Sequence, residues 1–122
     1  MPPRDIASYL RDIERASEGL LVIATGRTYE ELLEDLGFRW SIERGIQNIG
    51  EAMFQIKKLD HSVAERIDQN ERIIGCRHIL VHAYFEVRPQ ILWGIIDLHL
   101  VPLQVTVRDM LRALDEADNN EA

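Results

Sequence analysis

One segment decides the fold of this chain: Ile42-Glu43-Arg44-Gly45-Ile46-Gln47-Asn48-Ile49-Gly50-Glu51-Ala52-Met53-Phe54-Gln55-Ile56. Five of its apolar side chains recur at intervals of four and three residues, namely Ile42, Ile46, Ile49, Met53 and Ile56. This spacing puts them on one face of a helix that turns once every 3.6 residues or so. We therefore predict an amphipathic helix over about residues 38–59, with this apolar face in the core.

Helical spacing also precedes this segment. Apolar residues at that spacing predict a first helix over residues 4–24, which Gly26 ends. Thr28 is placed to cap a short second helix that runs through about Leu36. The chain therefore reaches its central helix through two helices joined by short links.

The pattern continues after the central segment. Residues 60–65 read as a connection, and a stripe of apolar residues over 73–87 predicts a fourth helix. Pro89 either ends that helix or begins the next one. The last helix is predicted over about residues 90–116, with a kink at Pro102.

These elements predict an all-α fold, an antiparallel bundle of four or five helices. The chain has 122 residues, which suits a single domain over residues 1–122. Its acidic end, residues 115–122, is expected to fray. Gly50 and Gly75 stand singly inside helical patterns and predict places where two helices come close.

The balance of charge limits the kinds of partner. The chain carries 14 Lys and Arg against 21 Asp and Glu, a net charge of −7. Binding of nucleic acid by general electrostatic attraction draws on many contacts between cations and phosphates, so this acidity argues against it. An enzyme that meets RNA through a small basic pocket is still compatible with this charge, as is a protein whose main partner is another protein.

Cysteine use and hydropathy indicate a compartment. Cys76 is the single cysteine, so an internal disulfide is impossible and a reducing cytoplasm is expected. Its place on an apolar stripe predicts a buried structural thiol. The first residues lack the build of a signal peptide, and no run approaches the roughly 20 apolar residues of a membrane span. Trp40 and Trp93 are predicted as core or interface rings.

A short motif inside the predicted fourth helix carries the chemistry. It reads Arg77-x4-His82-x-Tyr84 and combines a permanent cation, a titratable imidazole and a phenol within eight residues. Such groups can cleave a phosphodiester without a metal. A neutral His takes the proton of the ribose 2′-OH, and a second, protonated His gives one to the leaving 5′-oxygen. Arg77 offers a planar fork to the phosphate oxygens and stabilises the charge of the transition state.

Helix geometry separates the members of this motif. Arg77 and Tyr84 fall on nearly the same face, whereas His82 lies about 140° from Arg77 on an ideal helix. Either the helix loosens near His82 or a twofold dimer supplies the missing neighbour. In an isologous dimer one Arg and one His per chain become two of each in a shared cleft.

Simpler interpretations exist for each residue. Arg77, His82 and Tyr84 are most often an ion pair, a satisfied imidazole and a packed ring in a small helical protein. His78, His82 and Glu86 form a row at helical spacing that could hold zinc, although no Cys-x-x-Cys accompanies them. Glu51 either pairs with Arg77 and orients it or is solvated.

At these residues the chain resembles the HEPN superfamily and, within it, the HepT-type toxins of bacterial and archaeal toxin–antitoxin pairs. The resemblance covers about residues 4–115. It rests on the order and spacing of three features: Ile49-Gly50-Glu51-Ala52, then Arg77-x4-His82-x-Tyr84, then Trp93 followed by Val101-Pro102-Leu103.

The resemblance implies a helical bundle that forms a twofold homodimer with an active cleft at the interface. It implies a metal-independent RNase toxin without a cofactor, in which Arg77 and His82 match the catalytic pair and Glu51 is a supporting motif residue. It further implies neutralisation by an MNT-type nucleotidyltransferase antitoxin that transfers AMP from ATP to Tyr84. Bulk and negative charge there would block a phosphate that approaches Arg77.

Two features depart from the pattern of many relatives. His78 follows the motif arginine where Asn is common, and Asp68-Gln69-Asn70-Glu71-Arg72 lacks the usual Pro and Trp. His78 could serve as a hydrogen bonder, add a titratable group to the cleft, or do neither. The acidity of the chain also fits a rival function, a non-catalytic helical binding or regulatory subunit of a nucleotidyltransferase.

Overall fold

The computed structural model describes residues 4–121. Over that range the chain is helical and contains no strand, which confirms the predicted all-α class. The elements are α1 (Ile6–Ala24), α2 (Tyr29–Glu34), α3 (Leu36–Leu59), α4 (His61–Glu65), α5 (Asn70–His82), the 3₁₀ turn η1 (Tyr84–Glu86), α6 (Pro89–Gly94), the π-helical segment η2 (Ile95–His99) and α7 (Leu100–Glu121).

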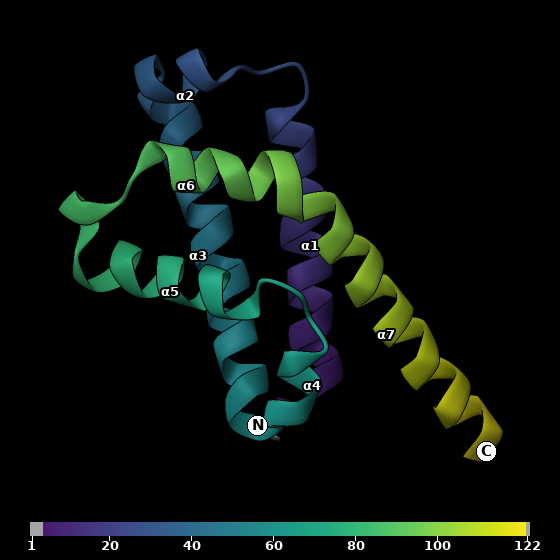
Figure 1. The fold of residues 1–122 in the computed structure, drawn as a ribbon. Helices are drawn as coiled ribbons and strands as arrows, with labels where there is room; N and C mark the ends of the chain where they lie inside the picture. Colours follow the sequence, from purple (N-terminus) through teal and green to yellow (C-terminus); the bar gives the residue numbers. More distant parts are fainter. Residues whose placement is uncertain (1–3, 122) are drawn as a thin grey trace.

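Helices α1 and α3 form a central antiparallel pair (Figure 1). The two helices come close together at Gly45, where an added Cβ would lie 2.4 Å from the Leu20 side chain. The remaining long helices do not all align with this pair. Helices α5 and α6 cross over α3, and α7 leaves the body at a slant after packing on α1 (Figure 1). The bundle is therefore part antiparallel and part crossed.

The core lies around α3, as the spacing of its apolar residues predicts. All five residues of that stripe are at most 1% exposed: Ile42, Ile46, Ile49, Met53 and Ile56. Helix α1 covers them with Leu10, Ile13 and Leu20, while the C-terminal helices add Leu92, Leu100 and Val107. Burial of these side chains from water is the main force that holds the helices together.

Side-chain caps fix where the first helices begin. The predicted cap Thr28 accepts a hydrogen bond from the Glu31 N–H at 3.2 Å at the start of α2. Asp35 accepts one from the Phe38 N–H at 3.1 Å, so α3 begins two residues before the predicted position. Asp60 caps the short helix α4, which corrects the expectation of a plain connection over residues 60–65. A carboxylate at a helix N-terminus is stabilised by the unpaired N–H groups there.

Helix α5 ends at His82, five residues before the predicted end at Val87. Pro89 occupies the first turn of α6 and holds Arg88 in extended backbone, because a residue before proline avoids the helical region. The helix itself ends earlier, before Ala83, whose φ of −142° and ψ of 48° are not helical, and the chain continues through the 3₁₀ turn Tyr84–Glu86. Tyr84 consequently lies beyond α5 rather than on its last turn.

The last helical stretch bends, as the proline predicts, although the bend lies before Pro102. The π-helical segment Ile95–His99 separates α6 from α7, and the chain changes direction between them (Figure 1). Pro102 cannot donate to the carbonyl of Leu98 and its ring crowds that carbonyl. A widened π turn at this place relieves the conflict.

Helix α7 continues to Glu121, and its residues 112–120 are exposed. The acidic end is thus helical through Glu121, so its fraying stays a prediction for solution, while Ala122 lies outside the described residues. The stretch Pro89–Asn120 is long and apolar enough to cross a membrane by length and composition alone, and 39% of its most apolar window is buried in the protein. A core helix passes the same test, and this stretch supplies Leu92, Leu100 and Val107 to the core.

Candidate functional site

Arg77 is positioned by the contact between α5 and α3. A Cβ added to Gly50 would lie 2.4 Å from the Cβ of Arg77 and 2.9 Å from the carbonyl oxygen of Ile73. Only a residue without a side chain fits there, so Gly50 marks the predicted close approach of two helices. Gly75 has nothing within 4 Å of such a Cβ, and its predicted role as a second close contact is wrong.

The guanidinium of Arg77 is anchored on α3. Its Nη2 lies 2.6 Å from Oε2 of Glu51, and its Cζ lies 5.5 Å from the centre of the Phe54 ring. The other oxygen of Glu51 accepts a hydrogen bond from Gln55 at 2.9 Å. Of the two interpretations of Glu51, the structure therefore supports the pair that orients Arg77.

This ion pair leaves hydrogen-bonding capacity unused. Oε2 of Glu51 lies in the ion pair with Nη2 of Arg77. In the described part of the chain, both Oε2 of Glu51 and Nε of Arg77 are buried without a hydrogen-bond partner. Buried polar groups are normally paired. The Arg77 side chain is 21% exposed, but its Nε is buried, so this donor is not open to an acceptor that arrives from solvent.

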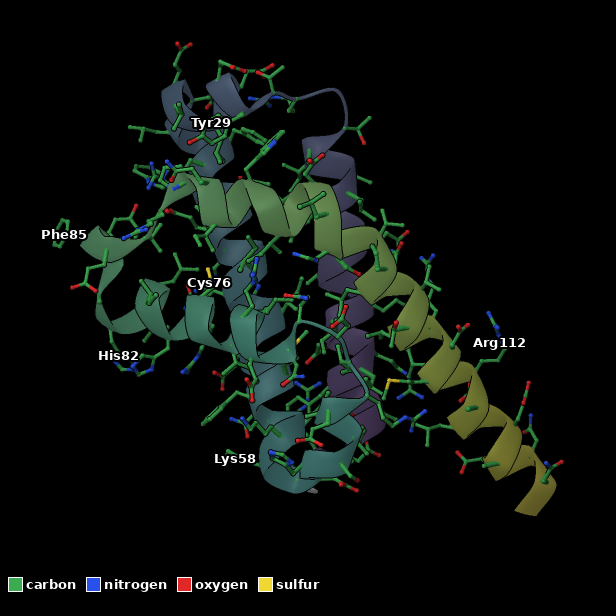
Figure 2. The ribbon with its side chains drawn as sticks, in the orientation of Figure 1. Tyr29, Lys58, Cys76, His82, Phe85 and Arg112 are labelled. Carbon is green, nitrogen blue, oxygen red and sulfur yellow. The ribbon has the colours of Figure 1, made fainter. Side chains whose placement is uncertain are left out.

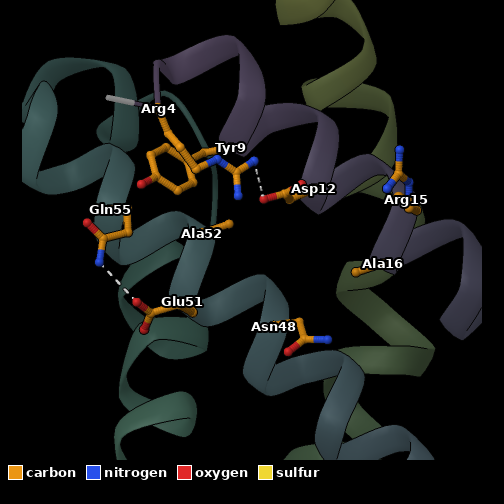
Figure 3. A pocket seen from close by; sticks show the side chains of 9 residues that line it. All are labelled: Arg4, Tyr9, Asp12, Arg15, Ala16, Asn48, Glu51, Ala52 and Gln55. Atoms are coloured by element: carbon orange, nitrogen blue, oxygen red, sulfur yellow. Dashed lines mark hydrogen bonds and ion pairs between the residues drawn. The ribbon is translucent and has the colours of Figure 1, made fainter. Parts of the chain in front are cut away.

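Glu51 also borders an open pocket between α1 and α3. The pocket has a volume of about 610 Å³, and Figure 3 shows Glu51 and Gln55 on one wall with Arg4 and Asp12 opposite. Arg4 forms an ion pair with Asp12 at 2.7 Å, and Arg15 stands at the rim. Glu51, which anchors Arg77, therefore also contributes to the lining of a pocket with several charged side chains.

The two motif histidines lie together on the solvent side of α5. The ring centres of His78 and His82 are 4.6 Å apart, and both residues are exposed (Figure 2 labels His82). The helix stays regular through His82, so it does not loosen early enough to turn that ring toward Arg77. Among the described residues, neither a hydrogen bond nor an ion pair joins Arg77 to His82. Within one protomer the two groups point to different sides of the helix.

Tyr84 is half exposed and its hydroxyl is tied inward. The side chain is 43% exposed, while the hydroxyl donates a hydrogen bond to Oε1 of Glu43 at 3.2 Å. Glu43 is 6% exposed, and its second oxygen accepts from Nε of Arg39 at 3.3 Å. Sequence reasoning missed Glu43 and Arg39. The available signal was that Glu43 stands seven residues before Gly50, on the same face of α3.

The alternative metal site is not assembled. Because α5 ends at His82, Glu86 leaves the helical face that carries His78 and His82. Residues 4–121 contain no group of three His, Cys, Asp or Glu side chains that could hold a metal ion. The zinc interpretation of this row is therefore wrong for a single protomer.

The other singled-out side chains have structural places. Burial raises the pKa of the Cys76 thiol to about 11, with a smaller contribution from Glu43, so the predicted buried, unreactive thiol is confirmed. The ring centres of Trp93 and Tyr29 are 6.2 Å apart, and Trp93 packs against the core, as predicted. Trp40 is 57% exposed, so it does not belong to the core.

The chain is thus an all-α protein whose Arg-x4-His-x-Tyr motif begins on α5 at an arginine packed against Gly50 of α3. The HepT-like family, described as Ribonuclease HepT-like, matches residues 6–110. The chain therefore belongs to the HepT-like ribonuclease family, and its predicted assignment as an RNA endonuclease is confirmed at that level.

Individual relatives agree with this assignment. The chain is similar to "Putative RNase MJ1216" of Methanocaldococcus jannaschii, at 24% identity over 98% of each chain. It is similar to "Putative RNase MJ0125" of the same organism, at 25% identity over 95% of this chain and 99% of that one. It is also similar to "Putative RNase TTE0752" of Caldanaerobacter subterraneus subsp. tengcongensis, at 28% identity over 85% of this chain and 92% of that one. No solved structure matches the chain significantly.

Proposed function

We propose that the chain is the toxin of a HEPN/MNT toxin–antitoxin pair, a cytoplasmic RNA endonuclease that works without a metal through Arg77 and His82. The observation that carries this proposal is the seating of Arg77. Its side chain is 21% exposed, and its position is fixed by the close contact with Gly50 and the ion pair with Glu51. A preorganised donor of this kind is suited to charge that develops in a transition state.

In the proposed reaction the ribose 2′-oxygen attacks the adjacent phosphorus. One neutral His82 takes the 2′-OH proton, the bond between phosphorus and the 5′-oxygen breaks, and a protonated His82 gives its proton to that leaving oxygen. The guanidinium of Arg77 binds the non-bridging oxygens, whose negative charge rises in the transition state. His78, at 4.6 Å from His82 between ring centres, supports or polarises its neighbour.

The reaction needs two histidines and an arginine in one cleft, which a single protomer does not bring together. We therefore propose a twofold homodimer in which α5 of each protomer faces the other. Apolar side chains beside the motif support this face, because Val81 is 43% exposed and Phe85 is fully exposed. Such an interface would cover both apolar side chains.

Neutralisation is proposed to occur at Tyr84. An MNT-type nucleotidyltransferase encoded beside this chain would transfer AMP from ATP to the tyrosine hydroxyl. The ring of Tyr84 is 43% exposed, which gives a partner access to it. Each added group brings negative charge and bulk near the proposed cleft, where it opposes an RNA phosphate.

Intact mass spectrometry tests the proposal directly. The chain is purified with and without the co-expressed nucleotidyltransferase and ATP, and each form is assayed for RNA cleavage. We expect whole AMP units on the co-expressed form only, their loss in Tyr84→Phe, and cleavage by the unmodified form only. Cleavage that persists unchanged after modification would contradict neutralisation at Tyr84.

A second function is favoured by one observation, the net charge of −7. A non-catalytic helical subunit that binds or regulates a nucleotidyltransferase would have no need of RNA affinity. Tight complex formation with the partner, together with an absence of RNA cleavage by the unmodified dimer, would favour this function over the nuclease.

A further inference from the structure

A buried carboxylate outside the proposed nuclease site holds the hydroxyl of Tyr84. Glu43 is 6% exposed and lies on the face of α3 that α5 and η1 cover. One oxygen accepts from the Tyr84 hydroxyl at 3.2 Å and the other from Arg39 Nε at 3.3 Å. The proposed RNA cleavage assigns no task to Glu43.

Packing alone does not explain this acid. Removing a carboxylate from water costs free energy unless it is paired and hydrogen-bonded, and an apolar side chain of similar size often serves stability equally well. Arg39, one turn earlier on the same helix, pairs with Glu43 and compensates its charge. The compensation is partial because the Arg39 side chain is itself 23% exposed to water. The pairing leaves Oε1 free to face the phenol.

The geometry around the hydroxyl meets the first requirement of general-base catalysis. A base must lie within hydrogen-bond reach of the proton that it removes, at about 2.6–3.2 Å between heavy atoms. Oε1 of Glu43 lies at 3.2 Å from the Tyr84 oxygen. Tyr84 as a residue is 43% exposed and Glu43 is 6% exposed, so the tyrosine is the member of the pair that solvent reaches.

We propose that Glu43 is the base that accepts the Tyr84 proton when the tyrosine is modified by a nucleoside triphosphate. This inference rests on the proposed modification of Tyr84. The O–H bond of Tyr84 breaks and its proton passes to Oε1 of Glu43. The phenolic oxygen forms a bond to the α-phosphorus, the bond from that phosphorus to the oxygen bridging to the β-phosphate breaks, and pyrophosphate leaves with the electron pair. Glu43 then returns the proton to solvent.

Three groups with titratable or permanent charge face Glu43. Arg39 contacts it from α3, Tyr84 from η1, and Cys76 is close enough on α5 for the charge of Glu43 to raise its pKa. The thiol is neutral at physiological pH, since its pKa is about 11. Arg39 thus supplies the fixed positive charge beside the carboxylate, and Tyr84 supplies the proton. The chain would carry part of the catalytic machinery for its own silencing.

The test compares Glu43→Gln with the wild-type chain, using the neighbouring nucleotidyltransferase and ATP. Gln keeps the shape and an acceptor oxygen but cannot take a proton. We expect the initial rate of AMP addition, followed by intact mass spectrometry, to fall about 100-fold or more. We also expect the remaining rate to rise more steeply with pH than that of wild type, because ionisation of the phenol must then precede attack. A purely structural role would not change the pH profile.

Controls separate this inference from the proposal on which it rests. Glu34→Gln removes an exposed carboxylate on α2 and should leave the rate unchanged. RNA cleavage by unmodified Glu43→Gln should match wild type. If the wild-type chain gains no AMP, the proposed function has failed. If wild type is modified and Glu43→Gln is modified as fast, the inference about Glu43 is overturned.

A second pair of variants applies if Glu43→Gln does not fold, as judged by circular dichroism. Glu43→Asp and Glu43→Asn are one methylene shorter and differ from each other only in the ability to accept a proton. We expect the Asp variant to be modified at least about tenfold faster than the Asn variant. Equal rates in this pair would overturn the inference.

Discussion

Helices α3 and α5 contact each other at Gly50, yet they differ in how they begin and in how much apolar surface they bury. Helix α3 begins at the capping carboxylate of Asp35 and carries one continuous buried stripe. Helix α5 begins after Gln69, which has a φ of 65° and gives no side-chain cap, and it buries three side chains, Ile73, Cys76 and Leu80. The scaffold helix thus has a side-chain cap and a continuous apolar stripe, whereas the helix that carries the motif has no side-chain cap and fewer buried side chains.

This difference shows where the stability of α5 comes from. A helix of 13 residues is marginal by itself in water, and the left-handed backbone of a non-glycine residue costs about 1–2 kcal/mol. Helix α5 is therefore held by its contact with α3 rather than by its own sequence. Its solvent-facing side carries His78 and His82, while Arg77 faces α3 at Gly50, and the choice of these residues serves function before folding.

The largest expected effect is a loss of function without a loss of fold. His82→Ala should reduce RNA cleavage about 100- to 10,000-fold, because it removes the proposed proton donor and acceptor. The free energy of unfolding should change by no more than about 0.5 kcal/mol, since His82 is exposed at the end of α5. RNA cleavage assays and denaturant unfolding measure the two effects. Retention of full cleavage by this variant would show that His82 is not catalytic.

An intermediate effect is expected where the two helices meet. Gly50→Ala places a Cβ at 2.4 Å from the Arg77 Cβ and 2.9 Å from a backbone oxygen of α5. Such overpacking should lower the free energy of unfolding by about 1–3 kcal/mol, and the displacement of Arg77 should lower cleavage as well.

Gly75→Ala is the matched control for this contact. It adds the same methyl group inside α5 where nothing lies within 4 Å. Because alanine favours a helix interior over glycine, it should raise stability by up to about 1 kcal/mol. Thermal or denaturant unfolding compares the pair, and equal effects of the two substitutions would contradict the close approach at Gly50.

The smallest expected effect is a loss of helix-cap stability at low pH. The Phe38 N–H and Arg27 hold the pKa of Asp35 below its ordinary value of 3.8, and the Ser8 N–H does the same for Asp5. Because these pKa values are lowered in the folded chain, the caps contribute stability above pH 3.8, and that contribution is lost as the pH falls through the folded values. The residue before the first turn of α5 is Gln69, which does not titrate.

Amide signals in NMR spectra can follow this titration along each helix. The Ser8 and Phe38 amides should shift with midpoints below 3.8, whereas the Ile73 amide, which donates to the Gln69 carbonyl, should lack this response. A midpoint at or above 3.8 for the Phe38 amide would show that Asp35 is not held by the cap.

Much of the scaffold could be predicted from the sequence because its signals are local. The stripe from Ile42 to Ile56 and the cap at Thr28 each depend on residues within a few turns of one another. The cap at Asp60 was equally local, but α4 is only five residues long and its pattern was too short to recognise. The end of α5 at His82 was missed because the apolar spacing persists through Val87 although the backbone does not.

The all-α class and the central helix follow from the sequence alone, because helical periodicity can be read from neighbouring positions. The same holds for the identity of the motif residues, whose chemistry is local. Three findings required the three-dimensional arrangement. Gly50 and not Gly75 lies at a helix contact, and Glu51 pairs with Arg77. The buried Glu43 accepts a hydrogen bond from the Tyr84 hydroxyl, 41 positions away in the sequence. Such pairings depend on how α3, α5 and η1 cross. That crossing is set by side-chain packing between helices that are distant in the sequence. The residue spacing within one helix therefore does not predict it.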